Sequence, residues 1–526
     1  MADKKFGVKQ LDLIGTGTPT IQSANNLNLN ATTTAISNDV TVGGNLTVTG
    51  SIIGINEVSV KDFGAKGDGT TDDTAAIQAA IDYAETKVIS TFRSGATVYF
   101  PAGTYVVSSG LTIDTGNVGI AGDGISASVI IADSPSFNVL SFDAGGSSVY
   151  RASVRDIRIL AIGNATAGAL LYMNRCLHSI VDSISLDGGF ECLKADGCNK
   201  LYINNILTHQ TSRSSGTPSY QLNFVSTANR CSDVHVTNFQ LFTQPSSRGN
   251  YSVSITGSDG IYFTSGHQHG GVILQPSGTA PEDICASVTW SNVYFDSSPE
   301  HHINFGGNAT SYRNFRFTNC VFRDGNSGVH VSSTSNVERV IFSGCQFQTH
   351  SQPAINQSAS GCKNWIIADT IFVDNTSTTG FISIEGENHL FNGLTFEGGN
   401  ASGTAITLTS ATSKCLLSDI SFRNCTSGTY ISNLGTGNKL GSGLDGYTLK
   451  STGTATINNG STSTNVTHNL SVTPSLANIN VQLSADASGV TRHYITNPTS
   501  TQFTINTDAT PSTTAQFVWS VDATNV

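Results

Sequence analysis

The sequence of 526 residues has few charged side chains. They make up only 12% of the chain, about half the usual share, which disfavours long helices exposed to solvent. There are only 26 Lys plus Arg against 37 Asp plus Glu, without a run of basic residues, so nucleic acid is not an expected partner. What remains is a β-rich protein whose exposed positions are filled by Ser, Thr and Asn.

Long apolar runs and paired cysteines are also absent from the sequence. No segment approaches the roughly 18 unbroken apolar residues of a membrane span, and the first residues lack the apolar core of a signal peptide. We therefore expect a soluble protein, made in a cytoplasm and not embedded in a membrane. The 10 Cys contain no CxxC pair, which argues against a zinc or redox motif and favours reduced thiols.

A short strand ending in Phe recurs between residues 286 and 425. It ends at Phe295, Phe322, Phe347, Phe372, Phe396 and Phe422, in steps of 24 to 27 residues. If each Phe points inward, the residue two positions before it points inward as well. A strand at this period, with Gly, Asn and Ser between copies, predicts a right-handed parallel β-helix in which like side chains stack about 4.8 Å apart.

The repeat is weaker upstream. There the matching strands end at Ile159, Leu186, Leu207, Phe242 and Phe263. Their spacing is irregular, so we expect long insertions between turns, notably residues 209–230 and 264–286.

A single helix is predicted just before the first turns, over roughly residues 73–88. Thr71 or Asp72 is its expected N-cap. Its apolar stripe consists of Ile77, Ala80, Ile81 and Ala84. Because a solenoid leaves its first turn open, the simplest role of this helix is that of a cap.

Three motifs in order resemble the opening segment of a known superfamily. They are VSVKDFGAKGDGTTDDTAAIQAAID at residues 58–82, VYFPAGTYVVSSGLTI at 98–113 and IAGDGISASVI at 120–130. This run is similar to the pectate-lyase-like parallel β-helix superfamily, in the form used by bacteriophage tailspikes and tail fibres, and the resemblance continues loosely to about residue 430. It implies a homotrimer that binds, and often cleaves, bacterial surface polysaccharide.

The ends of the chain look like those of phage fibres. Residues 38–54 place an apolar stripe on one face that is too narrow for one chain to bury and suits three chains winding together. We predict four parts, namely residues 1–55 as virion anchor and trimeric stalk, 56–135 as the opening β-helix segment with its capping helix, 136–438 as the parallel β-helix body, and 439–526 as a C-terminal β-sandwich. The expected location is the phage tail, assembled in the host cytoplasm and joined to a tail or adaptor protein through residues 1–55. A flexible leader is the alternative for the N-terminal residues.

Hydrolysis of a glycosidic bond needs two carboxyl groups, about 5 to 5.5 Å or about 6.5 to 9.5 Å apart. Adjacent and next-adjacent turns of a β-helix can supply both separations. We place the site in and after the segment 264–286, because loops on a solenoid's flank build binding surfaces. The candidate catalytic carboxylates are Glu282, Asp283, Asp296, Glu300 and Asp324. The candidate substrate-binding residues are Arg248, His267, His269, His301 and His302.

Several alternatives stay open. Asp296 is followed one turn later by Arg323, which also fits a plain ion pair. His267 and His269 have no third ligand at a fixed spacing, so neither a metal nor a cofactor is predicted. A lyase would need a base beside a group that neutralises a uronate carboxylate, and no such set stands out, so a glycoside hydrolase is favoured. A purely adhesive or structural fibre could have the same fold without catalytic residues.

Overall fold

The computed structural model describes residues 57–524 except 89–94, 211–219, 228, 244–250, 277–284, 307–311, 379, 399–403, 426–429, 446 and 486–488. The chain divides into two units, Met1–Ile52 and Ile53–Val526. The predicted anchor and stalk at residues 1–55 lie outside the described residues. Within the described part, no helix is long and apolar enough to cross a membrane.

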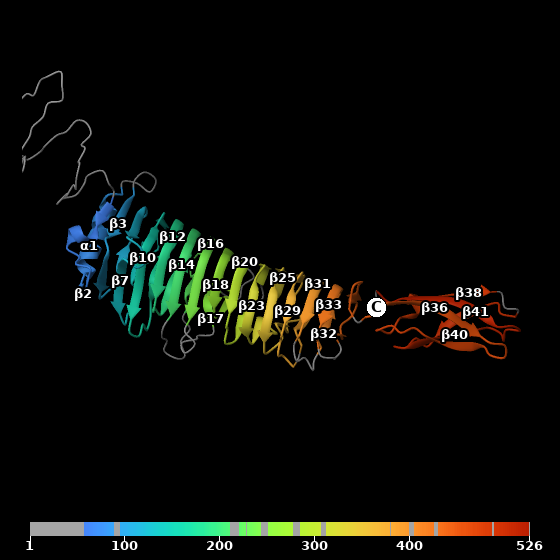
Figure 1. Cartoon of the computed structure of the whole chain (residues 1–526). Coiled ribbons are helices and arrows are strands. Elements are labelled where there is room, and N and C mark those ends of the chain that lie inside the picture. Colours follow the sequence, from blue (N-terminus) through green and yellow to red (C-terminus); the bar gives the residue numbers. More distant parts are fainter. Residues whose placement is uncertain are drawn as a thin grey trace, which may run out of the picture. The chain divides into compact units, whose positions relative to one another are not determined.

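A parallel β-solenoid forms the larger part of the second unit (Figure 1). Among the described residues, one side is a ladder of 13 parallel strands. In chain order these are β5 (Leu111–Ile113), β8 (Leu140–Phe142), β11 (Ala169–Asn174), β13 (Glu191–Asp196), β15 (Leu222–Val225), β17 (Tyr251–Thr256), β19 (Gly271–Gln275), β21 (His301–Phe305), β24 (Ser327–Val331), β27 (Ile355–Gln357), β30 (Ile382–Glu387), β32 (Ile406–Ser413) and β34 (Ile431–Asn433). The predicted parallel β-helix is confirmed.

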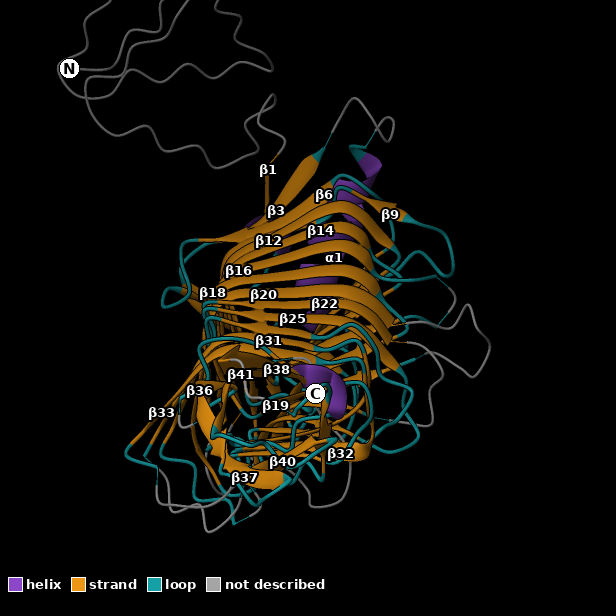
Figure 2. Cartoon of the chain, turned by 90° about the vertical axis from the view of Figure 1, so that its right-hand side faces the viewer, coloured by secondary structure: helices purple, strands orange, loops and turns teal. Residues whose placement is uncertain are grey.

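A second parallel ladder covers the other two sides of each turn, and Figure 2 shows its strands stacked in order. It comprises β1 (Glu57–Ser59), β2 (Asp68–Asp72), β3 (Ala96–Phe100), β4 (Gly103–Val107), β6 (Val118–Gly122), β7 (Ser128–Asp133), β9 (Val149–Tyr150), β10 (Ser153–Ile162), β12 (Cys176–Asp187), β14 (Asn199–Gln210), β16 (Ser232–Thr243), β18 (Asp259–His269), β20 (Cys285–Asp296), β22 (Tyr312–Thr318), β23 (Val321–Gly325), β25 (Val337–Ser343), β26 (Gln346–His350), β28 (Ile366–Ala368), β29 (Ile371–Val373), β31 (Leu390–Glu397), β33 (Leu416–Arg423) and β35 (Lys439–Leu440).

In each turn, a single residue forms the corner between the two sides that the second ladder covers. In β10 this residue is Asp156, and the residues before it pair with β6 while those after it pair with β7. The corresponding corner residues include Ser183, Asn205, Asn238, Ser265, Asn292 and Asn319, all with φ between 50° and 56°. Asn and Asp tolerate this left-handed conformation better than other non-glycine residues. The Asn-rich connections of the sequence therefore form compact corners.

The Phe column is the centre of the solenoid core. Phe322 stacks on Phe295 with ring centroids 4.7 Å apart and on Phe347 at 4.6 Å. The stack continues through Phe372, Phe396 and Phe422. The column five residues earlier is buried throughout and consists of Trp290, Phe317, Phe342, Ile367, Phe391 and Leu417. The predicted inward register between residues 286 and 425 is confirmed.

Upstream, the predicted register is wrong in three turns. Leu186 pairs with Thr208, which pairs with Leu241, and Leu241 pairs with Gln268. Gln268 in turn pairs with Phe295. The predicted Leu207 therefore lies one residue before the true column residue Thr208, and the predicted Phe242 lies one residue after Leu241. Phe263 belongs to the column of Trp290. Two buried polar residues, Thr208 and Gln268, hide the apolar pattern in the sequence.

The described residues of the segment 264–286 belong to strands of the solenoid, contrary to the expected insertion, and residues 277–284 lie outside the described residues. β18 continues to His269, β19 follows at Gly271–Gln275, and β20 begins at Cys285. Most of this segment therefore belongs to regular turns, and its histidines lie on a strand.

The predicted helix is α1, Thr74–Thr86, and its buried residues are the expected Ile77, Ala80, Ile81 and Ala84. They belong to the same core cluster as the first strands. The N-cap is Asp73 instead of Thr71 or Asp72, although an Asp72 carboxylate oxygen accepts from the Thr74 N–H at 3.0 Å. Two short 3-10 helices cover Val60–Phe63 and Leu476–Asn478.

Six antiparallel strands follow the solenoid in the sequence. They form the sheets β36-β41-β38 and β37-β40-β39. Their buried residues, among them Phe503, Phe517 and Trp519, form one cluster. The bounds are β36 (Lys450–Ile457), β37 (Ser463–Thr467), β38 (Ile479–Ala485), β39 (His493–Thr496), β40 (Gln502–Thr507) and β41 (Ala515–Asp522).

Candidate functional site

The strands that carry the Phe column also present side chains outward. Gln268 is buried, so its neighbours His267 and His269 point away from the core. His267 pairs with Tyr294 on the next turn, and His269 pairs with Asp296. Backbone register thus brings these four side chains onto one outward face.

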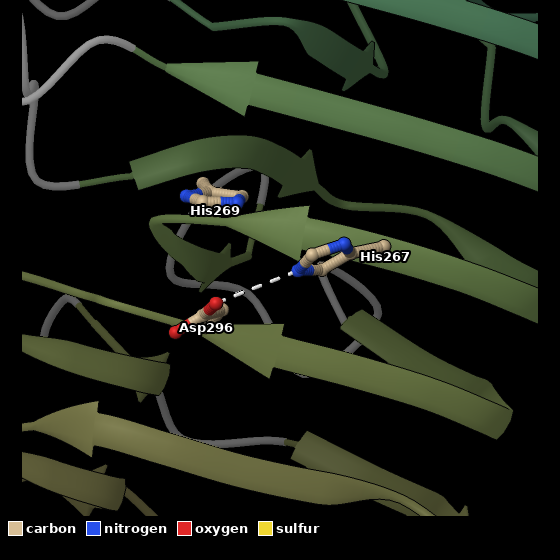
Figure 3. Close-up of side chains that lie close together, drawn as sticks. All are labelled: His267, His269 and Asp296. Atoms are coloured by element: carbon tan, nitrogen blue, oxygen red, sulfur yellow. Dashed lines mark ion pairs between the residues drawn. The ribbon is translucent and has the colours of Figure 1, made fainter.

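His267, His269 and Asp296 form a compact cluster on this face (Figure 3). One potential ligand atom from each lies within 4.8 Å of the other two. The His267 Nε2 atom is 3.6 Å from Asp296 Oδ2, which is beyond hydrogen-bond range. The other Asp296 oxygen accepts a hydrogen bond from the Ser297 hydroxyl at 2.9 Å.

Aromatic rings surround the cluster. The Phe242 ring centroid lies 5.6 Å from that of His267 and 5.2 Å from that of His269. The Tyr294 ring meets His267 edge-on at 5.2 Å. These rings shelter part of the cluster from solvent and offer apolar surface of the kind that packs against a sugar ring.

Arg323 belongs to this face, but its contacts differ from those expected. It is the register partner of Asp296, whereas its Nε pairs with Asp324 at 3.2 Å and its Nη1 donates to the Tyr294 hydroxyl at 3.2 Å. The described ion pair of Asp296 is with His267. The plain Asp296–Arg323 ion pair is therefore replaced by two contacts that hold Arg323 beside Tyr294.

Glu300 and His301 lie next to the 13-stranded ladder instead. The Tyr251 hydroxyl donates to a Glu300 carboxylate oxygen at 3.0 Å, and burial raises the pKa of Tyr251. The His301 ring stacks on His330 of the next turn with centroids 4.2 Å apart. Burial, with a smaller effect of His330, lowers the pKa of His301 to about 4.

His302 lies in the interior, with no exposed surface. Its Nε2 is 2.9 Å from the Arg323 carbonyl oxygen, and burial lowers its pKa to about 4. A side chain in this position does not reach a glycan at the outer surface, so its expected role in substrate binding is corrected. The remaining candidates Glu282, Asp283 and Arg248 lie outside the described residues.

A groove of about 550 Å³ lies on the adjoining outward side. Its lining combines aliphatic, amide and cationic side chains from successive turns, including Tyr262, Asn314, Arg316, Arg339, Ile341 and Ile366. Tyr262 ends a ladder in which His235 stacks on it at 4.8 Å and on Tyr202 at 5.2 Å. The sequence did not predict this groove or the position of Tyr294 beside His267 and Arg323, because each depends on which residues share a column.

Comparisons with known proteins agree with this fold. The family model described as rhamnogalacturonase A/epimerase, pectate lyase-like, matches residues 57–356. The tailspike protein of Escherichia coli bacteriophage HK620, solved in complex with a pentasaccharide, aligns with a TM-score of 0.56 at 11% identity, covering 89% of this chain and 94% of that one. The tailspike protein gp49 of Pseudomonas phage LKA1 aligns with a TM-score of 0.51 at 12% identity, covering 89% and 100%.

Among curated proteins, alginate lyase 7 of Azotobacter vinelandii is 51% identical over 80 residues, which is 14% of this chain and 9% of that protein. The match thus spans less than a tenth of that relative's length. The resemblance predicted from the three opening motifs is confirmed, since the family model covers more than half of the 526 residues. The chain belongs to the pectate-lyase-like family of rhamnogalacturonase A and epimerases.

Proposed function

We propose that this protein is a phage tail spike or fibre that binds a bacterial surface polysaccharide and cleaves its glycosidic bonds. The main support for this proposal is the outward face formed by Phe242, His267, Tyr294, Asp296 and Arg323. Rings, hydrogen-bonding groups and charges of both kinds converge there on consecutive turns. Family membership supports a polysaccharide-active enzyme, and the tailspike solved with a pentasaccharide supports glycan binding.

Hydrolysis assigns the proton transfers to carboxyl groups. Asp296 is the first candidate because it lies among the rings of this face. Asp324 on the next turn is the second, held by Arg323 and by the Thr349 hydroxyl, which donates to it. In this assignment one group protonates the glycosidic oxygen while the other acts on water or on the sugar.

The contact between Arg323 and Tyr294 favours β-elimination as a second chemistry. The Arg323 guanidinium would bind a uronate carboxylate, which makes the neighbouring C–H more acidic. A base such as Tyr294 or His267 would remove that proton, and the leaving oxygen would depart with the electron pair of the glycosidic bond. In this proposal Tyr294 or His267 is the base and Arg323 is the neutralising cation, a set that the sequence did not reveal.

The test uses the purified full chain with a panel of capsular and O-antigen polysaccharides. New reducing ends without unsaturated-sugar absorbance indicate hydrolysis, and both signals together indicate elimination. Binding without either signal overturns the cleavage proposal and leaves a non-catalytic adhesive or structural fibre. Failure to bind any phage-receptor glycan of the strain that the phage infects would contradict the whole proposal.

Amide replacements locate the carboxylates. We expect at least one of five variants to lose turnover by orders of magnitude while glycan binding and melting temperature stay unchanged. The variants are Glu282→Gln, Asp283→Asn, Asp296→Asn, Glu300→Gln and Asp324→Asn. Full activity in all five would remove the carboxylate site.

The proposed assembly is a homotrimer joined through residues 1–55 to a phage tail or adaptor protein, with the C-terminal sheets adding trimer contacts or glycan binding. Its support is the narrow apolar stripe at residues 38–54 and the similarity in fold to two phage tailspikes. Light scattering that gives a stable monomer at micromolar concentration would contradict it.

A further inference from the structure

The His267–His269–Asp296 cluster has a property that glycan cleavage does not require. Its three potential ligands come from two adjacent turns, with Asp296 directly opposite His269 in the ladder. His267 and His269 are two residues apart on β18, so both side chains leave the same side of the strand. The ladder hydrogen bonds thus fix the backbone positions of all three.

The geometry comes close to what a small cation needs. Metal–ligand bonds of about 2.0 to 2.2 Å in a tetrahedral site put two ligand atoms about 3.4 Å apart. The His267 Nε2 and Asp296 Oδ2 atoms are 3.6 Å apart, and the whole set lies within 4.8 Å. The His269 side chain would have to move by about 1 Å to complete such a set, which side-chain rotation can supply without a change in the backbone.

The nitrogen of His267 that faces Asp296 makes no hydrogen bond to the described residues. His267 Nε2 is shielded from solvent and has no hydrogen-bond partner among the described residues. Leaving such an atom unpaired costs free energy. In the tautomer with its proton on Nδ1, His267 presents the Nε2 lone pair to the carboxylate, and a cation between the two satisfies both groups.

Neighbouring groups orient the set. Ser297 holds one Asp296 oxygen, which leaves Oδ2 directed at His267. Phe242 packs against both histidine rings. The nearby cation Arg323 is engaged by Asp324 and Tyr294. Such partners around the ligands are the usual means of fixing a metal site.

We propose that His267, His269 and Asp296 bind one divalent metal ion of the zinc class. Two imidazole nitrogens and one carboxylate select Zn²⁺, Co²⁺ or Ni²⁺ over Ca²⁺ and Mg²⁺, which prefer oxygen ligands. The His267 and Asp296 side chains are 36% and 20% exposed, so the remaining coordination position opens to solvent. A bound ion takes His267 and Asp296, so under this inference Asp296 is a metal ligand and not the proton donor of the proposed hydrolysis.

The sequence missed this site because the third ligand is 27 residues away from His269. That distance is one turn of the solenoid. With the upstream register wrong, Asp296 could not be aligned with His269.

The test titrates the untagged full chain, freed of metal, with Zn²⁺ in a calorimeter and with Co²⁺ by visible absorption. We expect one ion per chain and a cobalt spectrum typical of nitrogen and oxygen ligands. His267→Gln, His269→Gln and Asp296→Asn each weaken binding at least about 100-fold. The matched control is His235→Gln, which changes another outward histidine of the same ladder.

Folding of each variant is checked by circular dichroism and melting. Unchanged affinity in a folded His269→Gln variant, or a preference for Ca²⁺ over Zn²⁺, overturns the proposal. Equal loss in His235→Gln would also overturn it, because binding would then be non-specific. The readout is independent of glycan cleavage, so failure of the proposed function leaves this result unaffected.

Discussion

His389 is a buried histidine whose neutral form is fixed by the backbone. Its Nε2 lies 2.7 Å from the Glu385 carbonyl oxygen, which only accepts, so Nε2 carries the proton. Its Nδ1 accepts a hydrogen bond from the Trp365 N–H at 3.2 Å. If Nδ1 were also protonated, its N–H would face the Trp365 N–H, and two donors would stand opposite each other without an acceptor. Acid should therefore destabilise the solenoid at this residue.

The size of the effect follows from the pKa. Burial lowers the pKa of His389 from 6.5 to about 4. The unfolded chain therefore takes up a proton near pH 6.5 that the folded chain refuses until about pH 4, and stability falls as the pH drops between these values. One pKa unit is worth about 1.4 kcal/mol, so the loss reaches about 3 kcal/mol at the lower limit and about 2 kcal/mol near pH 5.

The assay compares urea unfolding of the wild type and His389→Gln near pH 7.5 and near pH 5. A Gln amide can donate to Glu385 and accept from Trp365 without titrating. We expect the wild type to lose about 2 kcal/mol more than the variant between the two pH values. The exposed His178→Gln is the control and should behave like the wild type. An equal pH dependence in wild type and His389→Gln would refute the reasoning.

Three further predictions concern the core and the corners. Phe347→Ala should lower the free energy of unfolding by roughly 3 to 5 kcal/mol, because Phe347 is a ring of the continuous stack; an unchanged melting temperature would mean that it is not. Gly386→Ala should lower the melting temperature, because a Cβ would overlap the Cys362 carbonyl oxygen. Gly437→Ala, also at positive φ but with no atom within 4 Å of the added Cβ, should cost less, and equal losses would rule out the overlap. Cys198 is buried with a raised pKa, so it should react with thiol reagents only on unfolding, and rapid labelling of Cys198 itself in the folded protein would contradict this.

The fold could be predicted from the sequence in those turns where the inward Phe column contains only apolar residues. From Phe295 to Phe422 every turn puts Phe at the same place, and the period can be read directly from the sequence. The reading failed where the column holds Thr208 and Gln268, because buried polar residues look like surface positions in a sequence. The Gln268 amide nitrogen donates to the Gly270 carbonyl oxygen at 3.4 Å, whereas Thr208 Oγ1 and Gln268 Oε1 have no hydrogen-bond partner among the described residues.

The site was predictable residue by residue but not as a group. The sequence identifies His267, His269 and Asp296 as candidates because they lie in or just after the segment 264–286, which was expected to be an insertion on the flank of the solenoid. Their proximity depends on alignment between turns, and the register error at Gln268 broke that alignment. The sequence did not indicate Tyr294 as a candidate, because its hydrogen bond with Arg323 depends on the alignment of two turns.

The single-residue corners have a consequence for the evolution of this surface. Because Asn292 and its equivalents turn the chain within one position, the outward sides form a grid on which rows are turns and columns are strand positions. Replacing one outward side chain changes the chemistry at one surface position and leaves the register of the turns unchanged. Point substitutions at outward positions can thus change what this surface binds without altering the fold.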